Sequence, residues 1–112
     1  MTSKGKIVIL GAMPQETAVY SDYQCNQWKD LEVYVELAGI GKSNAAATTA
    51  RLIERYQPSL MIFTGVAGAL DGSLRQQDIG IVVGAVDTDV DVTDWKSNLR
   101  LGQLPNQERV YR

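Results

Sequence analysis

The sequence has 112 residues, of which 45% are hydrophobic and 21% are charged, the composition of a globular chain of about one domain. Eleven Lys and Arg against thirteen Asp and Glu leave a net charge of −2, without the positive surplus that nucleic-acid binding requires. The sequence contains no His, which excludes a Ser-His-Asp or Cys-His catalytic unit and the usual kinds of zinc site.

The cysteine content and the N-terminus indicate a cytoplasmic protein. Cys25 is the only cysteine, so an internal disulfide is excluded and a reducing compartment is favoured. Residues 1–6 are short and polar, with no long apolar run behind them as a signal peptide would have. No run of about 20 apolar residues is present to cross a membrane. We therefore expect neither nucleic acid nor membrane among the partners.

Four segments have the pattern of strands. Residues 6–10 form a β-branched run that stops at Gly11, and residues 31–37 alternate apolar and polar side chains. Residues 60–63 and 79–86 are apolar runs of strand length, as buried strands are. The sequence therefore predicts four strands in this order.

Between the second and third of these strands the apolar period becomes that of a helix. The helical pattern extends from Ser43 to about Tyr56, and Pro58 marks its end. One stripe of this helix carries Ala45, Ala46, Thr49, Leu52, Ile53 and Tyr56. A second helix, thin in apolar residues, is expected over about residues 15–24. A helix that connects two buried strands favours an α/β fold with a mixed, largely parallel central sheet and covering helices.

The predicted fold looks unfinished at its C-terminus. Three apolar strands need helices on both faces of the sheet, yet the sequence offers one strong helix. The last eighteen residues, from Trp95, show no clear period. We therefore expect residues 1–112 to form a single domain that is incomplete at its C-terminal end.

Two glycine turns before the long helix imitate nucleotide-binding motifs without completing them. Gly41-Lys42-Ser43 would need a glycine at position 36 to form a P-loop, and this position holds Glu36. Gly39-Ile40-Gly41 would need a third glycine at Asn44 to form a dinucleotide fingerprint. We therefore expect no nucleotide cofactor. The remaining feature is a glycine turn at a helix N-terminus, which lets a ligand approach backbone N–H groups or simply connects the two elements.

A cluster of aspartates near the C-terminus imitates a calcium loop. It consists of Asp87, Asp89, Asp91 and Asp94. An EF-hand would need glycine and glutamate at the positions of Val92 and Asn98. We therefore expect no metal site, and the first three aspartates would share the solvated face of a strand if that segment were extended.

Two loops that follow buried strands form the candidate site. Gly65-Val66-Ala67-Gly68 comes directly after the strand 60–63, where ligands usually bind in open α/β sheets. Glu16 follows Gly11 at the end of the first strand and would lie over the same edge of the sheet. A carboxylate at this edge is suited to act as a general base on water, with Met13 as an apolar wall. The spacing alone favours a surface acid near a helix start.

Four ordered segments, taken together, resemble 5′-methylthioadenosine/S-adenosylhomocysteine nucleosidases of the nucleoside phosphorylase/nucleosidase superfamily. They are Gly11-Ala-Met-Pro-Gln-Glu16, Ala38-Gly-Ile-Gly-Lys42, Thr64-Gly-Val-Ala-Gly68, and Gln77-Asp-Ile-Gly-Ile-Val-Val83 leading into Asp91-Val-Thr93. The later Gly102-Gln-Leu-Pro105 fits the same enzymes. The resemblance covers the N-terminal half of the family pattern.

The resemblance implies a role for individual residues. Glu16 matches the glutamate that activates the attacking water, while Ala12, Met13 and Ile40 match residues of the substrate pocket. The loop beside the base and ribose takes in Val66, Ala67 and Gly68, and Val66 replaces the hydroxyl residue usual there. Trp95 and Pro105 match positions that close the 5′-alkylthio pocket of the neighbouring subunit in a homodimer.

The implied activity is hydrolysis of the N-glycosidic bond of purine nucleosides such as 5′-methylthioadenosine or S-adenosylhomocysteine, with release of adenine, in methionine salvage. In the family, two further parts of the site lie in a C-terminal half: the aspartate that protonates the leaving group, and a Met-Glu pair that holds the ribose. That half has no counterpart here. Residues 1–112 alone are therefore expected to be inactive. Two alternatives remain: a nucleoside phosphorylase, and a non-catalytic nucleoside-binding or interaction domain.

Overall fold

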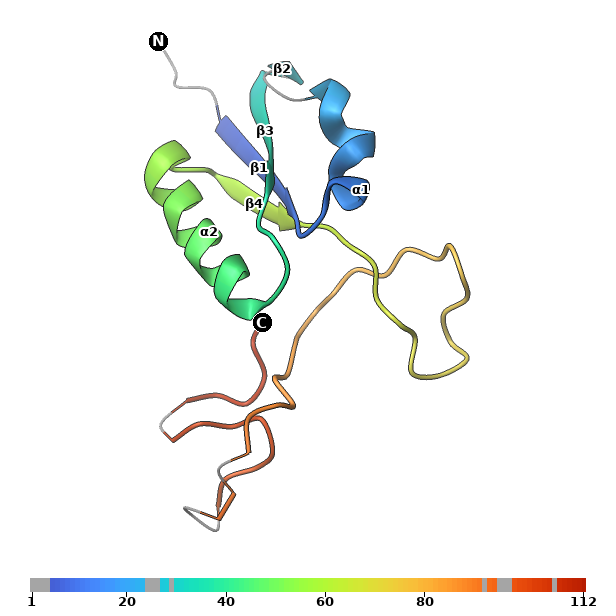
Figure 1. The fold of residues 1–112 in the computed structure, drawn as a ribbon, viewed down its shortest axis with the longest axis vertical. Helices are drawn as coiled ribbons and strands as arrows, with labels where there is room; N and C mark the ends of the chain where they lie inside the picture. The colour runs from blue at the N-terminus through green and yellow to red at the C-terminus, as the bar shows by residue number, and fades with distance from the viewer. Residues whose placement is uncertain (1–4, 24–26, 29, 92, 95–97, 106) are drawn as a thin grey trace. The chain divides into compact units, whose positions relative to one another are not determined.

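The computed structural model describes residues 5–23, 27–28, 30–91, 93–94, 98–105 and 107–112 (Figure 1). The chain divides into two compact units, Met1–Gly68 and Ala69–Arg112, and each is described here by itself. Within the described residues, all assigned helices and strands lie in the first unit.

A mixed sheet with the strand order β2-β3-β1-β4 forms the centre of the first unit. β1 (Gly5–Gly11) lies between β3 (Leu31–Leu37) and β4 (Leu60–Phe63) and is parallel to both. β2 (Gln27–Trp28), which the sequence did not predict, pairs antiparallel with β3. The α/β fold with a largely parallel sheet is confirmed. Because β1, β3 and β4 run the same way, their carboxyl ends share one edge of the sheet.

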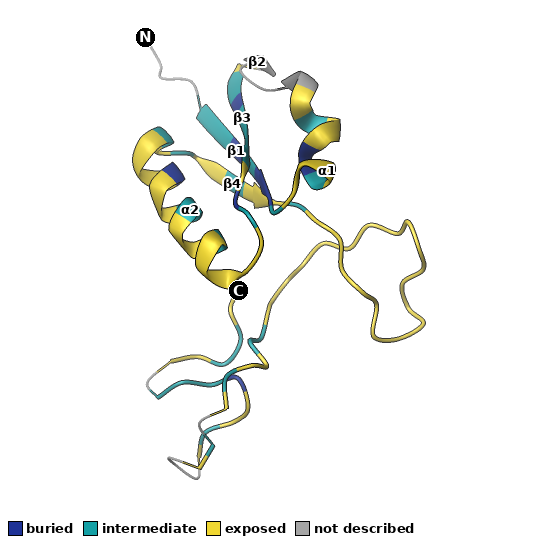
Figure 2. Cartoon of the chain, viewed as in Figure 1, coloured by how far each residue is buried: buried dark blue, intermediate teal, exposed yellow. Residues whose placement is uncertain are grey.

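One face of this sheet packs against α2 (Lys42–Tyr56), which crosses over from β3 to β4. Leu52 of α2 is 1% exposed and forms the core with buried side chains of the strands and of Ala38 (Figure 2). The predicted stripe is correct at Leu52 and Tyr56 but wrong at Ala46 and Ile53, which are exposed. The helix touches the sheet along a narrower strip than the sequence suggested, so its flanks face water.

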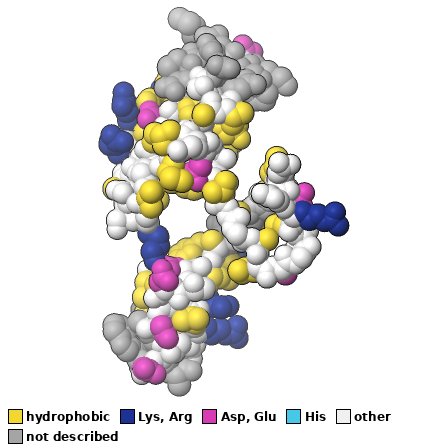
Figure 3. Space-filling model, turned by 45° about the vertical axis from the view of Figure 1, so that its right-hand side comes forward, with side chains coloured by type: hydrophobic (Ala, Val, Ile, Leu, Met, Phe, Trp, Pro, Cys, Tyr) yellow, Lys and Arg dark blue, Asp and Glu magenta, His cyan; other side chains and the backbone are white. Residues whose placement is uncertain are grey.

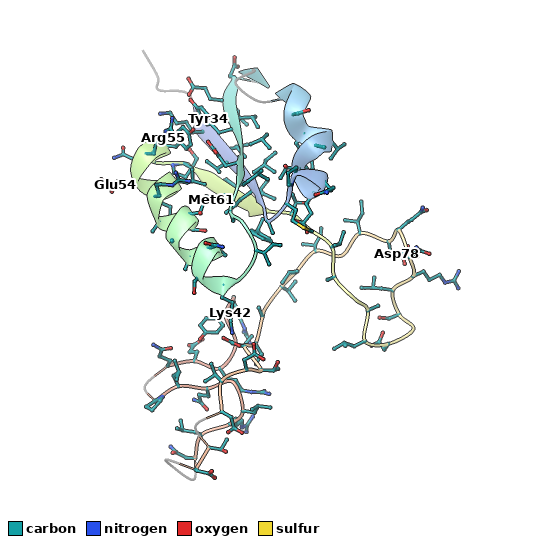
Figure 4. All side chains as sticks on the ribbon, in the orientation of Figure 1. Tyr34, Lys42, Glu54, Arg55, Met61 and Asp78 are labelled. Carbon is teal, nitrogen blue, oxygen red and sulfur yellow. The ribbon has the colours of Figure 1, made fainter. Side chains whose placement is uncertain are left out.

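The polar hydroxyls at the edges of this core are anchored by neighbouring acids. The rings of Tyr34 and Tyr56 stack with centroids 4.1 Å apart. The Tyr56 hydroxyl donates a 2.7 Å hydrogen bond to Glu36 Oε1, and the Tyr34 hydroxyl donates one of 2.8 Å to Glu32 Oε2. The Arg55 guanidinium lies 5.1 Å from the centre of the Tyr56 ring, at this end of α2 (Figure 4). These contacts hold the C-terminal end of α2 on the sheet.

The predicted helix over residues 15–24 is divided into two short pieces. An α-helical turn, α1 (Pro14–Thr17), is followed by a 3₁₀ helix, η1 (Ala18–Tyr23). α1 contacts β1 and β3, and η1 contacts β3. β-Branched and aromatic residues such as Val19 and Tyr20 have low helix propensity, and few apolar side chains are available to hold a longer amphipathic helix. Thr17 is buried, and its hydroxyl donates to the Pro14 carbonyl oxygen at 3.4 Å.

The strand predicted for residues 79–86 is wrong. Residues 79–84 form no strand, and only Ala85 pairs, in an isolated bridge with Tyr111. Apolar side chains of this run are 80–92% exposed: Ile79, Ile81, Val82 and Val83. A strand requires a hydrogen-bonded neighbour along its length, and no described segment of the second unit supplies one there. Apolar composition alone did not determine the structure of this run.

The aspartate-rich segment is also not extended as a strand would be. The amide of Val90 donates to the Asp87 carbonyl oxygen, and the amide of Asp89 donates to Asp87 Oδ1, which folds residues 87–90 into a turn. The condition under which Asp87, Asp89 and Asp91 would share one strand face is therefore not met. Asp side chains cap local turns readily, and this preference prevails here over strand formation.

Apolar side chains are visible on the surface of the described chain (Figure 3). In the first unit they include Leu60, Ile62 and Phe63 of β4, the edge strand of the sheet. None of the helices in the described ranges is of the length and apolar character that crossing a membrane requires.

Candidate functional site at the carboxyl edge of the parallel strands

Backbone hydrogen bonds tie together the segments that leave the three parallel strands. The Ala38 amide, after β3, donates to the Gly11 carbonyl oxygen at 2.8 Å. The Thr64 amide, after β4, donates to the Leu10 carbonyl oxygen at 2.8 Å. The loops that follow β1, β3 and β4 therefore start from one fixed edge. The carboxyl edge of parallel strands is the usual place for a ligand in an open α/β sheet.

Glu16 is held at this edge by the turn that follows β1. Its Oε2 accepts hydrogen bonds from the amides of Ala12 at 2.8 Å and Met13 at 3.0 Å. The Glu16 amide in turn donates to the Met13 carbonyl oxygen at 3.0 Å. Because the side chain is half-buried and has two backbone donors on one oxygen, the carboxylate has a defined position. These contacts are those of a glutamate at the third residue of a helix.

The second oxygen of Glu16 lies toward the loop after β4. A Cβ atom placed on Gly65 would lie 3.1 Å from Glu16 Oε1. The structure thus brings Glu16 beside the first residue of the Gly65–Gly68 loop, where the sequence analysis expected it. Oε2 is engaged with the backbone of its own turn, whereas Oε1 is the oxygen presented to the neighbouring loop.

Residues predicted to line the substrate pocket lie on the loops that leave this edge. Met13 is 37% exposed, and Ile40 and Val66 are 72% and 85% exposed. Ala12 is half-buried, and its amide donates to Glu16 Oε2. Ala67 and Gly68, at the end of the first unit, are exposed. These side chains belong to the three loops that the sheet edge brings together, and most of them face outward.

The loop that carries Ile40 depends on a residue that the sequence analysis did not single out as functional. Gly39 and Gly41 have φ angles of 82° and 97°, in the region that favours glycine. Asn44 Nδ2 donates to the Ile40 carbonyl oxygen at 2.8 Å. An Asn in the first turn of a helix that follows Gly-X-Gly is the signal that would have identified it, because Asn readily bonds to nearby backbone groups.

The remaining predicted site residues lie outside the first unit. Trp95 lies outside the described residues. Pro105 is half-buried in the second unit. Among the described residues, no group of three or more Cys, Asp or Glu side chains is arranged to hold a metal ion. The first unit therefore supplies the Glu16 carboxylate at this edge, with Met13 and Ile40 exposed on loops that leave it.

This arrangement suits proton transfer at a bound organic molecule. A carboxylate with one oxygen fixed and the other directed to a loop can accept a proton from a water molecule held beside it. Exposed apolar side chains on the adjoining loops provide surface for an uncharged ligand. Backbone amides and glycines at the strand ends allow close approach of a flat ring.

Comparison with known proteins gives one consistent result. The family model described as the phosphorylase superfamily matches residues 6–110. A 5′-methylthioadenosine/S-adenosylhomocysteine nucleosidase of Staphylococcus haemolyticus is 38% identical over 113 aligned residues, which cover 88% of this chain and 49% of that protein. The corresponding enzyme of Bacillus pumilus is 36% identical, over 89% of this chain and 48% of its own length.

Solved structures agree with these relatives. A nucleosidase of the same name from Colwellia psychrerythraea, in complex with adenine, superposes with a TM-score of 0.85 at 31% identity, covering 96% of this chain and 50% of that one. Futalosine hydrolase of Helicobacter pylori superposes with a TM-score of 0.84 at 26% identity, covering 95% and 51%. The chain spans about half the length of the curated relatives it matches.

Proposed function

The chain belongs to the phosphorylase superfamily, as its motifs predicted, and on that premise we propose that it is the N-terminal part of a purine nucleoside N-ribosyl hydrolase. The proposed reaction cleaves the N-glycosidic bond of nucleosides such as 5′-methylthioadenosine or S-adenosylhomocysteine and releases adenine. The observation that carries the proposal is Glu16, fixed by the amides of Ala12 and Met13 at the carboxyl edge of the sheet. Similarity to nucleosidases, one of them solved with adenine, supports the choice of reaction.

In the proposed mechanism Glu16 is the general base. Cleavage of a glycosidic bond passes through an oxocarbenium-like sugar, which a water molecule attacks at the anomeric carbon. Glu16 takes a proton from this water, so that the oxygen becomes a better nucleophile as the bond to adenine breaks. The water proton ends on the carboxylate, and the water oxygen ends on C1′ of the ribose. The half-buried side chain with two fixed donors on Oε2 is already positioned before substrate binds.

The loops at the same edge would contact the nucleoside. We assign Met13 and Ile40 to the ribose and 5′-alkylthio group, with Ala12 beside them. Val66, Ala67 and Gly68 would lie beside the base and ribose. Val66 has no hydroxyl to donate to the sugar or the water, so binding there rests on shape and apolar contact.

The remaining parts of the reaction need residues beyond those described. Adenine must be protonated as it leaves, and the ribose hydroxyls must be held. Because the chain spans about half of its relatives, we assign the leaving-group acid and the ribose-binding pair to the half that it does not span. On this view residues 1–112 form one domain of a larger α/β fold. Trp95 and Pro105 would complete the 5′-alkylthio pocket of the neighbouring subunit in a homodimer.

Location and metabolic role follow from the same proposal. A lone cysteine suits the reducing cytoplasm. Release of adenine from 5′-methylthioadenosine is a step of methionine salvage, and we place the protein there. The similar fold of a futalosine hydrolase makes futalosine worth testing beside the two named substrates.

The decisive test is Glu16→Gln in the full chain, that is, the protein that also contains the half with the proposed leaving-group acid. Gln keeps the shape of Glu but cannot take the proton, so kcat for adenine release should fall by about 10²–10⁴-fold. Glu54→Gln is the matched control, because Glu54 is an exposed residue of α2 that points away from the sheet (Figure 4). Its kcat should stay within twofold of the unaltered chain. Adenine release is followed by absorbance or chromatography with 5′-methylthioadenosine.

The other outcomes separate the competing functions. Turnover of Glu16→Gln within a few-fold of the unaltered chain would exclude Glu16 as the base. Turnover that requires phosphate, with ribose 1-phosphate as product, would indicate a phosphorylase instead. A chain that binds nucleoside without turnover would be a binding module, which Val66 and the partial coverage of its relatives would then explain.

A further inference from the structure

A side chain added to Gly65 would have Glu16 as its nearest neighbour. The three atoms closest to a Cβ built on Gly65 all belong to Glu16: Oε1 at 3.1 Å, Cδ at 3.4 Å and Oε2 at 3.8 Å. A contact of 3.1 Å is tighter than ordinary van der Waals contact, so the neighbour would have to move by a few tenths of an ångström. Any side chain at this position would therefore act first on the carboxylate.

The backbone of Gly65 gives no other reason for glycine. Gly39 and Gly41 have positive φ angles, which other residues adopt only with strain, whereas Gly65 does not. The φ angle of Gly65 lies outside the positive region, and the atoms closest to an added methyl group would be those of Glu16. A substitution of Gly65 therefore tests the steric effect on the carboxylate without adding the backbone strain of a positive φ angle.

Backbone hydrogen bonds hold both sides of this contact. On one side, Glu16 Oε2 is held by the amides of Ala12 and Met13. On the other, Thr64, the residue before Gly65, is tied to β1 by its hydrogen bond to the Leu10 carbonyl oxygen. A Cβ on Gly11 would lie 3.3 Å from Glu16 Cβ and 2.6 Å from Thr17 Cγ2, so the turn also lies close against the end of β1. Glu16 thus lies beside the end of β1 and the start of the loop that follows β4.

We propose that Gly65 is a positioning residue for Glu16: the absence of a side chain there sets where Oε1 lies and so where the attacking water is held. The inference rests on the proposed function, in which Glu16 activates that water. A methyl group at position 65 would displace Oε1 while leaving the carboxylate chemically intact. Displacement of a catalytic group by about 1 Å can cost about 10²-fold in rate, so a shift of a few tenths should cost roughly tenfold.

The steric link is tested by a double-mutant cycle in the full chain that does not depend on activity. Gly65→Ala is made with Glu16 present and in a Glu16→Ala background, and urea unfolding midpoints are compared. Gly65→Ala should lower the midpoint when Glu16 is present and leave it unchanged or raise it when the carboxylate is gone. Gly72→Ala, where a Cβ would meet nothing within 4 Å, controls for the general effect of Gly to Ala.

If Gly65→Ala lowers the unfolding midpoint equally in the two backgrounds, the steric link is overturned, because the added methyl group would then clash with something other than Glu16. Should Gly65→Ala fail to fold, the double variant decides. Recovery of folded protein in Glu16→Ala/Gly65→Ala supports the link, and failure of the double variant while Glu16→Ala folds overturns it.

The catalytic sense of the proposal is tested by kinetics on the same full chain. Gly65→Ala should lower kcat for adenine release by roughly tenfold while KM stays within twofold, and Gly72→Ala should change neither. An unchanged kcat, or a loss confined to KM, would overturn the positioning role. Full turnover by Glu16→Gln would instead overturn the proposed function, and the cycle of unfolding midpoints would still report whether Gly65 fixes Glu16.

Discussion

Leu52 is the residue through which α2 is attached to the sheet. Its side chain is 1% exposed and, with Val8, is one of the two largest fully buried side chains. It packs with Val8, Leu10 and Ala38, and the partly buried Met61 lies against this cluster (Figure 4). The cluster is small, so each of its members contributes a large share of the apolar surface buried between α2 and the strands. Leu52→Ala is therefore the sharpest test of the packing described for the first unit.

The expected loss in the free energy of unfolding of Leu52→Ala follows from the number of atoms removed and from how far α2 can settle toward the strands. Leu to Ala in a protein core costs about 2–5 kcal/mol, depending on how far the surroundings collapse into the cavity. α2 touches the sheet along a narrow strip, with Ala46 and Ile53 exposed on its flanks, so it can settle partly toward the strands. This places the expected loss near the middle of that range, at about 3 kcal/mol.

Urea unfolding followed by far-ultraviolet circular dichroism measures this loss. Ile53→Ala is the matched control, because Ile53 is adjacent on the same helix and 49% exposed. Removing its half-exposed side chain should cost below about 1 kcal/mol. Equal losses for the two variants, or a loss below about 1 kcal/mol for Leu52→Ala, would refute the assignment of Leu52 to the core and the packing of α2.

Two further predictions concern single hydrogen bonds. Tyr56→Phe keeps the ring stacked on Tyr34 but removes the 2.7 Å bond to Glu36, so the free energy of unfolding should fall by about 1 kcal/mol in urea; an unchanged midpoint would contradict this. Hydrogen bonds from Thr93, first from its hydroxyl and then from its amide, hold the pKa of Asp91 below its ordinary value of 3.8. These bonds stabilise the folded state above pH 3.8, and this stabilisation is lost as the pH falls through the lowered pKa. Thr93→Ala should therefore raise the pKa of Asp91 toward 3.8 in an NMR titration, and an unmoved pKa would show that the hydroxyl is not responsible.

The strands and helix that the sequence located correctly are those in which local pattern and burial agree. Residues 6–10, 31–37 and 60–63 became β1, β3 and β4 because apolar or alternating runs of strand length had neighbours to pair with. The long helix begins at Lys42, next to the predicted start, because the glycine turn before it frees the chain to change direction. For these elements local preference and tertiary pairing point to the same structure.

The sequence-based predictions failed in two situations. A strand-like pattern had no neighbouring strand to pair with, or a strand formed by pairing although its residues carry no strand pattern. Residues 79–84 have the composition of a strand but no described partner in their unit, so their side chains stay exposed. β2 was not predicted, because two residues carry no period and gain their structure from pairing with β3. The division of residues 14–23 into α1 and η1 likewise depended on how those residues contact the sheet.

The candidate site shows the same division between sequence and structure. The position of Glu16 after the first strand and of Gly65 after β4 was enough to predict that they share an edge, because parallel strands end on the same side. Sequence could not show that Oε1 lies against Gly65, because this contact joins residues far apart in the chain, whereas the two amides that hold Oε2 belong to the same turn as Glu16. The order of motifs indicated the family; only the packing of the strand ends decided that Oε1 of Glu16 lies against Gly65, because contacts between these loops form once the sheet has brought them together.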